Sequence, residues 1–233
     1  MKKFIFNYLC LLLLLSTTAN AQDAKATKII EEAIKAMGGK ELLMSISTLY
    51  TKSSTTMEGH NVQWITKEMT PNKGSFIIEF EGRTIYKSFY DGQKGYELVD
   101  GKKQLADQSQ FDDKQYRTSI FNEIDYLNPT FYKLEFVKEE MLDGKKCNKL
   151  QATLKNGKVT LLYYDTKSKF LVKSETVKNG GSETFSVTLF ENYKKFGDLF
   201  YFSRMVFPSN EGKQVAEIEE LYYNKGITQQ DFE

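Results

Sequence analysis

The chain is punctuated by pairs of turn-forming residues that separate runs rich in Val, Ile, Thr, Phe and Tyr. Two-residue hairpin turns need positive φ angles, which glycine adopts freely and Asn and Asp tolerate. The repeated pattern therefore predicts consecutive β-hairpins in a large antiparallel sheet. The turn pairs are Glu81-Gly82, Asp91-Gly92, Asp100-Gly101, Asp143-Gly144, Asn156-Gly157, Asn179-Gly180 and Glu211-Gly212.

Between these turns the sequence predicts a mainly β fold with helices. In residues 75–80 the side chains of Phe76, Ile78 and Phe80 point to one face, and those of the residues between them point to the other. This two-residue period is typical of a strand in a sheet with one face exposed to water. A first amphipathic helix is expected at residues 27–37, where Gly38-Gly39 stops it. Strands are expected at residues 48–57, 62–70, 75–80, 84–90, 95–99, 134–141, 147–154, 158–164, 170–177, 184–193, 199–207 and 214–223.

The first 21 residues have the pattern of a cleavable export signal. Lys2 and Lys3 precede an almost wholly apolar run at residues 4–15, and Ala19-Asn20-Ala21 supplies small residues at a cleavage site. The run is shorter than the roughly 20 residues that span a bilayer. We therefore expect cleavage near Ala21, a periplasmic protein without a transmembrane anchor, and one domain at residues 22–233.

Charge and cysteine content exclude several classes of function. Without Lys2 and Lys3 the chain carries one acidic residue more than basic residues, so nothing attracts nucleic acid. Loss of Cys10 with the signal leaves Cys147 as the only cysteine, which rules out an internal disulfide. We expect Cys147 to be a buried strand residue.

The hairpin series is interrupted between residues 105 and 133. There an apolar stripe recurs at helical spacing and ends at Asn128-Pro129. We expect a helix that lies outside the strand ladder and acts as a movable lid. The stripe consists of Tyr116, Ile120, Phe121, Ile124 and Leu127.

The chain resembles the LolA-like family of outer-membrane lipoprotein-sorting and lipid-binding proteins over essentially its whole mature length. The resemblance is carried by the exported N-terminus, the first helix with Gly38-Gly39, Tyr90-Asp91-Gly92, the insert at residues 111–127, residues 143–150, 161–165, 171–175 and 223–227, and Asp231-Phe232. It implies an unclosed, strongly curved antiparallel β half-barrel covered by helices. It also implies that the concave face accepts a lipid or an acylated lipoprotein, with an envelope receptor or donor as a further partner and no cofactor. The family includes envelope sensor domains, so a non-carrying sensor or protein-interaction domain is the alternative.

The residues that would support catalysis are missing. His60 is the only histidine and falls in an expected turn, and no nucleophile elbow, phosphate loop or C-x-x-C motif is present. The acidic pairs Glu139-Glu140 and Glu219-Glu220 lie on strands, where neighbouring side chains point to opposite faces. We therefore expect no catalytic residue, no metal site and no enzyme activity.

An apolar binding face is expected instead, because several strands carry large apolar residues on both sides. Arg204 would share a face with Phe202 and either pair with a nearby Glu or recognise a head group. An interior filled by Phe and Tyr, without a pocket of roughly 300 Å³ or more, would favour the non-carrying alternative. The candidate cavity and lid residues are Trp64, Phe76, Ile78, Phe80, Tyr116, Ile120, Phe121, Ile124, Leu161, Tyr163, Phe202 and Arg204.

Overall fold

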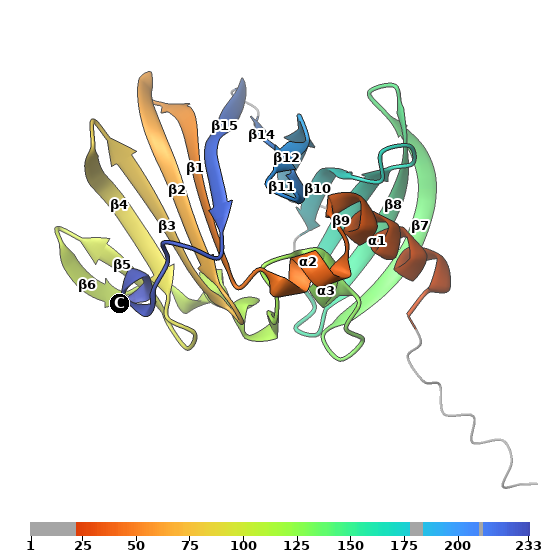
Figure 1. Ribbon diagram of the computed structural model, residues 1–233, viewed down its shortest axis with the longest axis horizontal. Coiled ribbons are helices and arrows are strands. Elements are labelled where there is room, and N and C mark those ends of the chain that lie inside the picture. Colours follow the sequence, from red (N-terminus) through yellow and green to blue (C-terminus); the bar gives the residue numbers. More distant parts are fainter. Residues whose placement is uncertain (1–21, 178–183, 210–211) are drawn as a thin grey trace, which may run out of the picture.

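The computed structural model describes residues 22–177, 184–209 and 212–233 (Figure 1). The expected signal peptide at residues 1–21, the turn at Asn179-Gly180-Gly181 and Glu211 of the turn Glu211-Gly212 lie outside these residues. The helices are α1 (Ala24–Met37), α2 (Lys40–Ser45) and α3 (Asn122–Tyr126), with short 3-10 turns η1 (Gln108–Phe111), η2 (Lys114–Tyr116) and η3 (Gln229–Phe232). The strands are β1 (Thr48–Met57), β2 (His60–Met69), β3 (Lys73–Phe80), β4 (Arg83–Tyr90), β5 (Gly95–Val99), β6 (Lys102–Leu105), β7 (Tyr132–Leu142), β8 (Lys145–Leu154), β9 (Val159–Asp165), β10 (Leu171–Val177), β11 (Thr184–Glu191), β12 (Lys194–Phe196), β13 (Leu199–Tyr201), β14 (Arg204–Ser209) and β15 (Gly212–Tyr223).

The described strands form one open antiparallel sheet of 13 strands and a separate hairpin of β12 and β13. The order in the large sheet is β6-β5-β4-β3-β2-β1-β15-β14-β11-β10-β9-β8-β7. The mainly antiparallel β prediction is confirmed. Because β6 and β7 are the two edges of this sheet, the chain between them, residues 106–131, must cross from one edge to the other (Figure 1).

The hairpin turns have the geometry that the sequence predicts. Asp100 and Gly101 have φ angles of 50° and 73°, and Asp143 and Gly144 have φ angles of 46° and 79°. Two successive positive φ angles give a turn whose twist matches that of the flanking strands. Each of these turns therefore joins two neighbouring strands directly, β5 to β6 and β7 to β8.

Two expected elements differ from the structure. The expected strand at residues 199–207 is interrupted after Tyr201, so β13 leaves the large sheet and β14 joins it. The alternation that placed Arg204 beside Phe202 therefore does not apply across the break. The expected helix at residues 111–127 is also wrong, because this segment consists of η1, η2 and the five-residue α3 joined by irregular backbone.

The helices pack on one half of the sheet. Ile30, Ala33 and Ile34 of α1 lie in the main core with Leu150 of β8 and Leu162 of β9. Helix α1 begins at the cap Asp23, whose carboxylate accepts hydrogen bonds from the backbone of Lys25 and Ala26, and it ends at Gly38 with a φ of 131°. Figure 1 shows α1, α2 and α3 in front of β7 to β10, whereas the half formed by β1 to β6 is not overlaid by them.

The C-terminal segment packs on the opposite side of the sheet. Phe232 is fully buried against Phe89 of β4 and Ile227. Nearby, the Lys67 Nζ lies 2.5 Å from the Asp231 carboxylate. This small second core fixes the end of the chain to β2, β3 and β4 without touching the helix-bearing face.

We expect Phe232→Ala to lower the free energy of unfolding by about 3–5 kcal/mol, because the substitution leaves a cavity in this second core. Chemical denaturation of the purified protein measures the change. Gln230→Ala is the control, since Gln230 is exposed in the same 3-10 turn and should change stability by less than about 0.5 kcal/mol. Equal effects of the two variants would contradict a packing role for Phe232.

Candidate ligand-binding site

The strand register defines which residues share the face that carries the helices, here called the inner face. Residues paired across neighbouring strands point to the same side of a sheet. Leu150 pairs with Leu162 and Leu162 with Ser174, and these pairs lie under the helices. The same face continues through the pairs Ser174 and Thr188, Phe190 and Met205, Met205 and Ala216, Ala216 and Thr55, Ser53 and Trp64, and Trp64 and Ile78.

Strands β2, β3, β4 and β14 carry a cluster of aromatic side chains on the inner face. The ring of Trp64 lies 5.6 Å from that of Phe76 and 5.7 Å from that of Phe207, and Phe76 lies 6.3 Å from Tyr86. All four side chains are partly exposed. We call these four residues the inner aromatic cluster.

The candidate residues from the sequence divide between the two faces. Trp64, Phe76 and the buried Ile78 lie together on the inner face, and Phe80 lies near its end, 5.3 Å from the ring of His60. Leu161 pairs with Gln151 and Glu175, on the side opposite to Leu162.

Tyr163 and Arg204 also lie on the outer face. The Tyr163 hydroxyl donates to the Glu175 carboxylate at 2.8 Å, and the ammonium groups of Lys149 and Lys173 lie 4.9 Å from its ring. Arg204 forms ion pairs with Glu191 and Glu217 of neighbouring strands.

The expectation that groups Leu161, Tyr163 and Arg204 with the cavity is therefore corrected. Adjacent strand residues alternate between faces, and the break at residues 202–203 places Arg204 away from Phe202.

Two glycines on the inner face make room for the crossing segment, residues 106–131. Gly74 and Gly95 lie on either side of Tyr90 in the register, and both are buried. A Cβ at Gly95 would come within 2.2 Å of the Phe111 ring, and a Cβ at Gly74 within 3.2 Å of the Lys114 Nζ. The Gln108 side chain accepts from the Gly95 N–H at 3.0 Å and donates to its carbonyl at 2.9 Å. These contacts attach the start of the crossing segment to β3, β4 and β5.

The end of the crossing segment belongs to the main core. Ile120 and Phe121 are buried there, with Ile124 packed against the same cluster, while Tyr116 lies 6.0 Å from the ring of Phe131. Phe121 also lies 6.4 Å from Tyr201. Ile120 and Phe121 are therefore buried, as the stripe predicts, but they lie before the short helix α3 and not on one long helix.

Arg117 and Asp125 hold the backbone of the crossing segment in place. The Arg117 guanidinium donates to the carbonyls of Ser119 at 3.1 Å and Ile120 at 2.6 Å, and its Nε lies 3.3 Å from the Asp125 carboxylate. Asp125 is buried and accepts from the Thr118 N–H at 3.1 Å. Burial lowers the pKa of Arg117, but the negative charges of Glu68 and Asp125 raise it by more. The guanidinium therefore keeps its charge.

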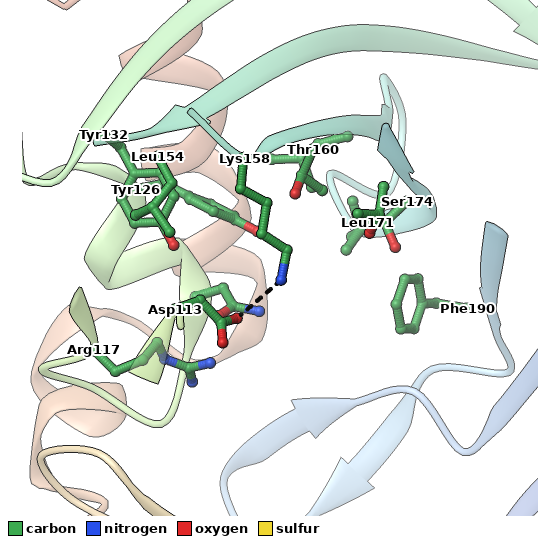
Figure 2. Close-up of a pocket in the computed structure, with 13 residues that line it drawn as sticks. Asp113, Arg117, Tyr126, Tyr132, Leu154, Lys158, Thr160, Leu171, Ser174 and Phe190 are labelled. Atoms are coloured by element: carbon green, nitrogen blue, oxygen red, sulfur yellow. Dashed lines mark hydrogen bonds and ion pairs between the residues drawn. The ribbon is translucent and has the colours of Figure 1, made fainter. Parts of the chain in front are cut away.

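The crossing segment and strands β7 to β11 line a cavity of about 210 Å³, here called the donor-rich cavity (Figure 2). Figure 2 shows the Lys158 side chain reaching into it toward Asp113, with an Nζ to carboxylate distance of 3.4 Å, while Thr160 and Ser174 lie on another wall. The lining residues are Asp113, Arg117, Asn122, Tyr126, Tyr132, Leu154, Lys158, Thr160, Leu162, Leu171, Ser174, Thr176 and Phe190.

Two further cavities continue along the inner face. One of about 140 Å³ is largely aromatic, is lined by Phe121, Tyr193, Tyr201 and Phe202, and is here called the aromatic cavity. The other, of about 170 Å³, lies where the crossing segment meets β2, β3 and β4, and Phe76 and Lys114 belong to its lining. None of these three cavities reaches roughly 300 Å³, and a smaller pocket favours the non-carrying alternative.

Sequence reasoning missed the polar part of this site. Thr160 and Ser174 follow the strand alternation that also places Leu162 on the inner face, so their orientation could have been inferred. The approach of Lys158 to Asp113 could not have been inferred, because nothing in the sequence indicates that the crossing segment meets the start of β9. Among the described residues, no group of three or more His, Cys, Asp or Glu side chains is placed to hold a metal ion.

Comparison with solved structures shows what this arrangement resembles. A domain assigned to outer membrane lipoprotein sorting from Vibrio parahaemolyticus matches with a TM-score of 0.61 and 16% identity over 89% of this chain and 96% of that chain. A LolA superfamily protein from Nitrosomonas europaea matches with a TM-score of 0.62 and 12% identity over 89% of this chain and 97% of that chain. The chain has a LolA-like fold.

The LolA-like fold is also seen in a third comparison, a DUF1329 family protein from Desulfovibrio piger, with a TM-score of 0.58 and 15% identity over 89% of this chain and 97% of that chain. No protein-family model and no curated protein matches the sequence. At these identities the likeness concerns the fold alone. None of the helices in the described part of the chain is long and apolar enough to cross a membrane.

A buried acid forms part of the wall of the aromatic cavity. Glu123 of α3 is buried, and its carboxyl lies 3.3 Å from the Tyr164 hydroxyl. Burial raises the pKa of Glu123, while the hydrogen bond from Tyr164 and the charge of Arg117 act in the opposite direction. The folded protein therefore holds a proton on Glu123 at pH values at which the unfolded chain releases it.

This raised pKa gives a pH-dependent stability. The folded state binds more protons than the unfolded state above pH 4.5, the ordinary pKa of Glu, so the contribution of Glu123 is present below that pH and declines as the pH rises. We expect Glu123→Gln to be more stable than the wild type at pH 8 and to lose that advantage near pH 4. Thermal unfolding across this range measures it, with the exposed Glu31→Gln as control. A constant difference between Glu123→Gln and wild type at all pH values would contradict the raised pKa.

Proposed function

We propose that this protein is an exported periplasmic binding protein that holds a lipid, or the acyl group of a lipoprotein, on the inner face of its sheet. The observation that carries this proposal is the inner aromatic cluster, whose four large side chains remain partly exposed on one face. Contiguous exposed apolar surface on a folded protein commonly marks a binding site. A sheet of this kind that is also curved into a half-barrel would surround an apolar ligand on several sides.

The proposed location rests on the N-terminal sequence. The basic start, the short apolar run and Ala19-Asn20-Ala21 fit an export signal. The LolA-like fold supports the same proposal, because one structure that shares it is described as a lipoprotein-sorting domain. By the same reasoning an acylated lipoprotein, delivered by a donor and taken up by a receptor, is a candidate partner.

Binding would be driven by burial of methylene groups, each of which contributes about 0.8 kcal/mol when it leaves water. The inner aromatic cluster lies next to the cavity of about 170 Å³ through Phe76. The donor-rich and aromatic cavities lie on the helix-bearing half of the same face. A long chain would therefore lie along the face and occupy several small cavities. We propose binding without catalysis.

The alternative is a non-carrying sensor or protein-interaction domain on the same fold. One observation favours it: each of the three cavities described on the inner face is smaller than roughly 300 Å³, the lower end of the range for ligand pockets. In that case the inner aromatic cluster would contact a protein segment. The two functions differ in whether a lipid alone binds.

Trp64 gives a direct test, because it is the only tryptophan in the sequence and belongs to the inner aromatic cluster. We expect a fatty acid with an attached fluorophore to bind and to change the Trp64 emission. Replacing both Phe76 and Phe207 with Ala should raise its dissociation constant by about tenfold or more, because two apolar contacts are lost.

Tyr50→Ala is the matched control. Tyr50 is a partly exposed aromatic residue that stacks on Tyr222 at 4.4 Å, and its register partner Lys67 lies on the outer face. The Tyr50→Ala substitution should therefore leave the affinity for the lipid unchanged. If the wild type shows no change in Trp64 emission and native mass spectrometry finds no co-purifying lipid, the carrier proposal is wrong and the interaction domain replaces it.

A further inference from the structure

The donor-rich cavity contains polar side chains that no partner in the described part of the chain satisfies. Thr160, Ser174 and Thr176 line it, and their hydroxyl groups make no hydrogen bond to a described residue. Thr160 pairs with Thr176 across β9 and β10, and Ser174 pairs with Leu162, so all three point to the inner face. All three residues are partly exposed, so their hydroxyls face a space that water can enter and are available to a polar ligand.

Two tyrosines, the buried Tyr126 and the partly buried Tyr132, add further donors. Tyr126 is 6% exposed and its ring packs against that of Tyr132 at 5.0 Å, and the hydroxyl groups of both have no hydrogen-bond partner in the described residues. Burial raises the pKa of Tyr132 to about 12 and that of Tyr126 well above its ordinary value. Both hydroxyls therefore remain protonated at neutral pH and can donate.

Two cations complete the cavity. The Lys158 Nζ has one acceptor, Asp113, at the long distance of 3.4 Å, although an ammonium group can donate three hydrogen bonds. The Nε and Nη2 atoms of Arg117 are engaged, whereas its Nη1 has no acceptor among the described residues. Asp113 is the only carboxylate in the lining. Donors therefore outnumber acceptors around this space.

The neighbouring residue Lys114 is a third cationic side chain that interacts with Arg117 and Lys158. Burial lowers its pKa, and the charges of Arg117 and Lys158 lower it further, while Glu68 and Asp113 act in the opposite direction. Three cationic side chains thus lie close enough on the crossing segment and β9 to influence one another. A ligand rich in acceptor oxygens would reduce their mutual repulsion.

The donor-rich cavity is contiguous with an apolar one. Asn122, Leu171 and Phe190 belong to the lining of both the donor-rich cavity and the aromatic cavity. The second is enclosed by Phe121, Tyr201 and Phe202. A polar space beside an aromatic space matches a molecule with a polar head and an apolar chain.

We propose that the donor-rich cavity binds the anionic head group of an amphiphile, a phosphate or carboxylate, with Lys158 and Arg117 as its cationic contacts and Thr160, Ser174 and Thr176 as its hydroxyl contacts. This inference rests on the proposed function, since it assigns the head of the lipid whose chain occupies the aromatic cavity. The protein would then select lipids by the charge of the head group as well as by the acyl chain.

The test compares two lipids with the same acyl chain and glycerol unit. Oleoyl lysophosphatidic acid carries a phosphate, and monoolein carries a hydroxyl in its place. Binding of each to the wild type is measured by calorimetry and by Trp64 emission below the concentration at which the lipid aggregates. Inorganic phosphate is titrated separately, so that a free anion is distinguished from a lipid head group.

We expect lysophosphatidic acid to bind about tenfold or more tightly than monoolein, because charge-assisted hydrogen bonds form only with the phosphate. Lys158→Gln should remove this preference and leave the affinity for monoolein unchanged. Lys158 is partly exposed at the start of β9, so its replacement should not unfold the protein. Lys155→Gln is the matched control, since Lys155 is exposed in the same β8 to β9 hairpin and does not line the cavity.

The outcomes separate the two proposals. If both lipids bind wild type equally and Lys158→Gln changes neither affinity, the head-group assignment is overturned and the lipid-binding function stands. If neither lipid binds, the proposed function fails and the head-group assignment fails with it. Binding of inorganic phosphate without either lipid would assign the cavity to a free anion and overturn the head-group assignment. A loss of affinity in Lys155→Gln equal to that in Lys158→Gln would also overturn it, because the effect would then be one of net charge.

Discussion

The pairing of β1 with β15 is the interaction on which the rest of the structure depends. The chain forms one series of hairpins from β1 to β6 and another that begins at β7, and β1 and β15 join them into one sheet. Because each strand adds beside the last, β6 and β7 end at opposite edges although they are neighbours in sequence. Residues 106–131 must therefore cross the sheet. Without the pairing of β1 with β15, this connection would only link two separate sheets.

The crossing segment brings together the groups that make the site. Gly74 and Gly95 allow it to approach the sheet closely, and Phe111 and Lys114 occupy the space where a side chain on either glycine would lie. Its later part, at Phe121, joins the main core with α1. Between these two attachments, Arg117 faces strands that lie far away in the sequence. The site is thus a consequence of topology, because its cations and hydroxyls come from elements that no local turn connects.

The two halves of the inner face are stabilised differently. On the half formed by β7 to β10, helix α1 covers the apolar side chains and excludes water from them. On β2, β3, β4 and β14 the inner aromatic cluster is left partly exposed, while Phe232 packs against the opposite face of β4. Stability therefore comes from the helix-bearing half and from the outer C-terminal core. This division leaves the inner aromatic cluster available for a ligand.

Local residue chemistry by itself determined the hairpins, the first helix and the mainly antiparallel sheet. Asp100-Gly101 and Asp143-Gly144 form tight turns because these residues accept positive φ angles, and α1 ends at Gly38 for the same reason. Alternation also placed Trp64, Phe76 and Ile78 on one face. Only the tertiary structure decided that this face is the inner one and that Tyr163 and Arg204 lie on the outer face. It also decided that residues 111–127 form no single helix. The stripe from Tyr116 to Leu127 has helical spacing, but contacts with the glycines, the buried Asp125 and the core outweigh the weak propensity of an isolated short helix. The donor-rich cavity depends on strands and a crossing segment that meet only in the folded protein, so no local pattern could have predicted it.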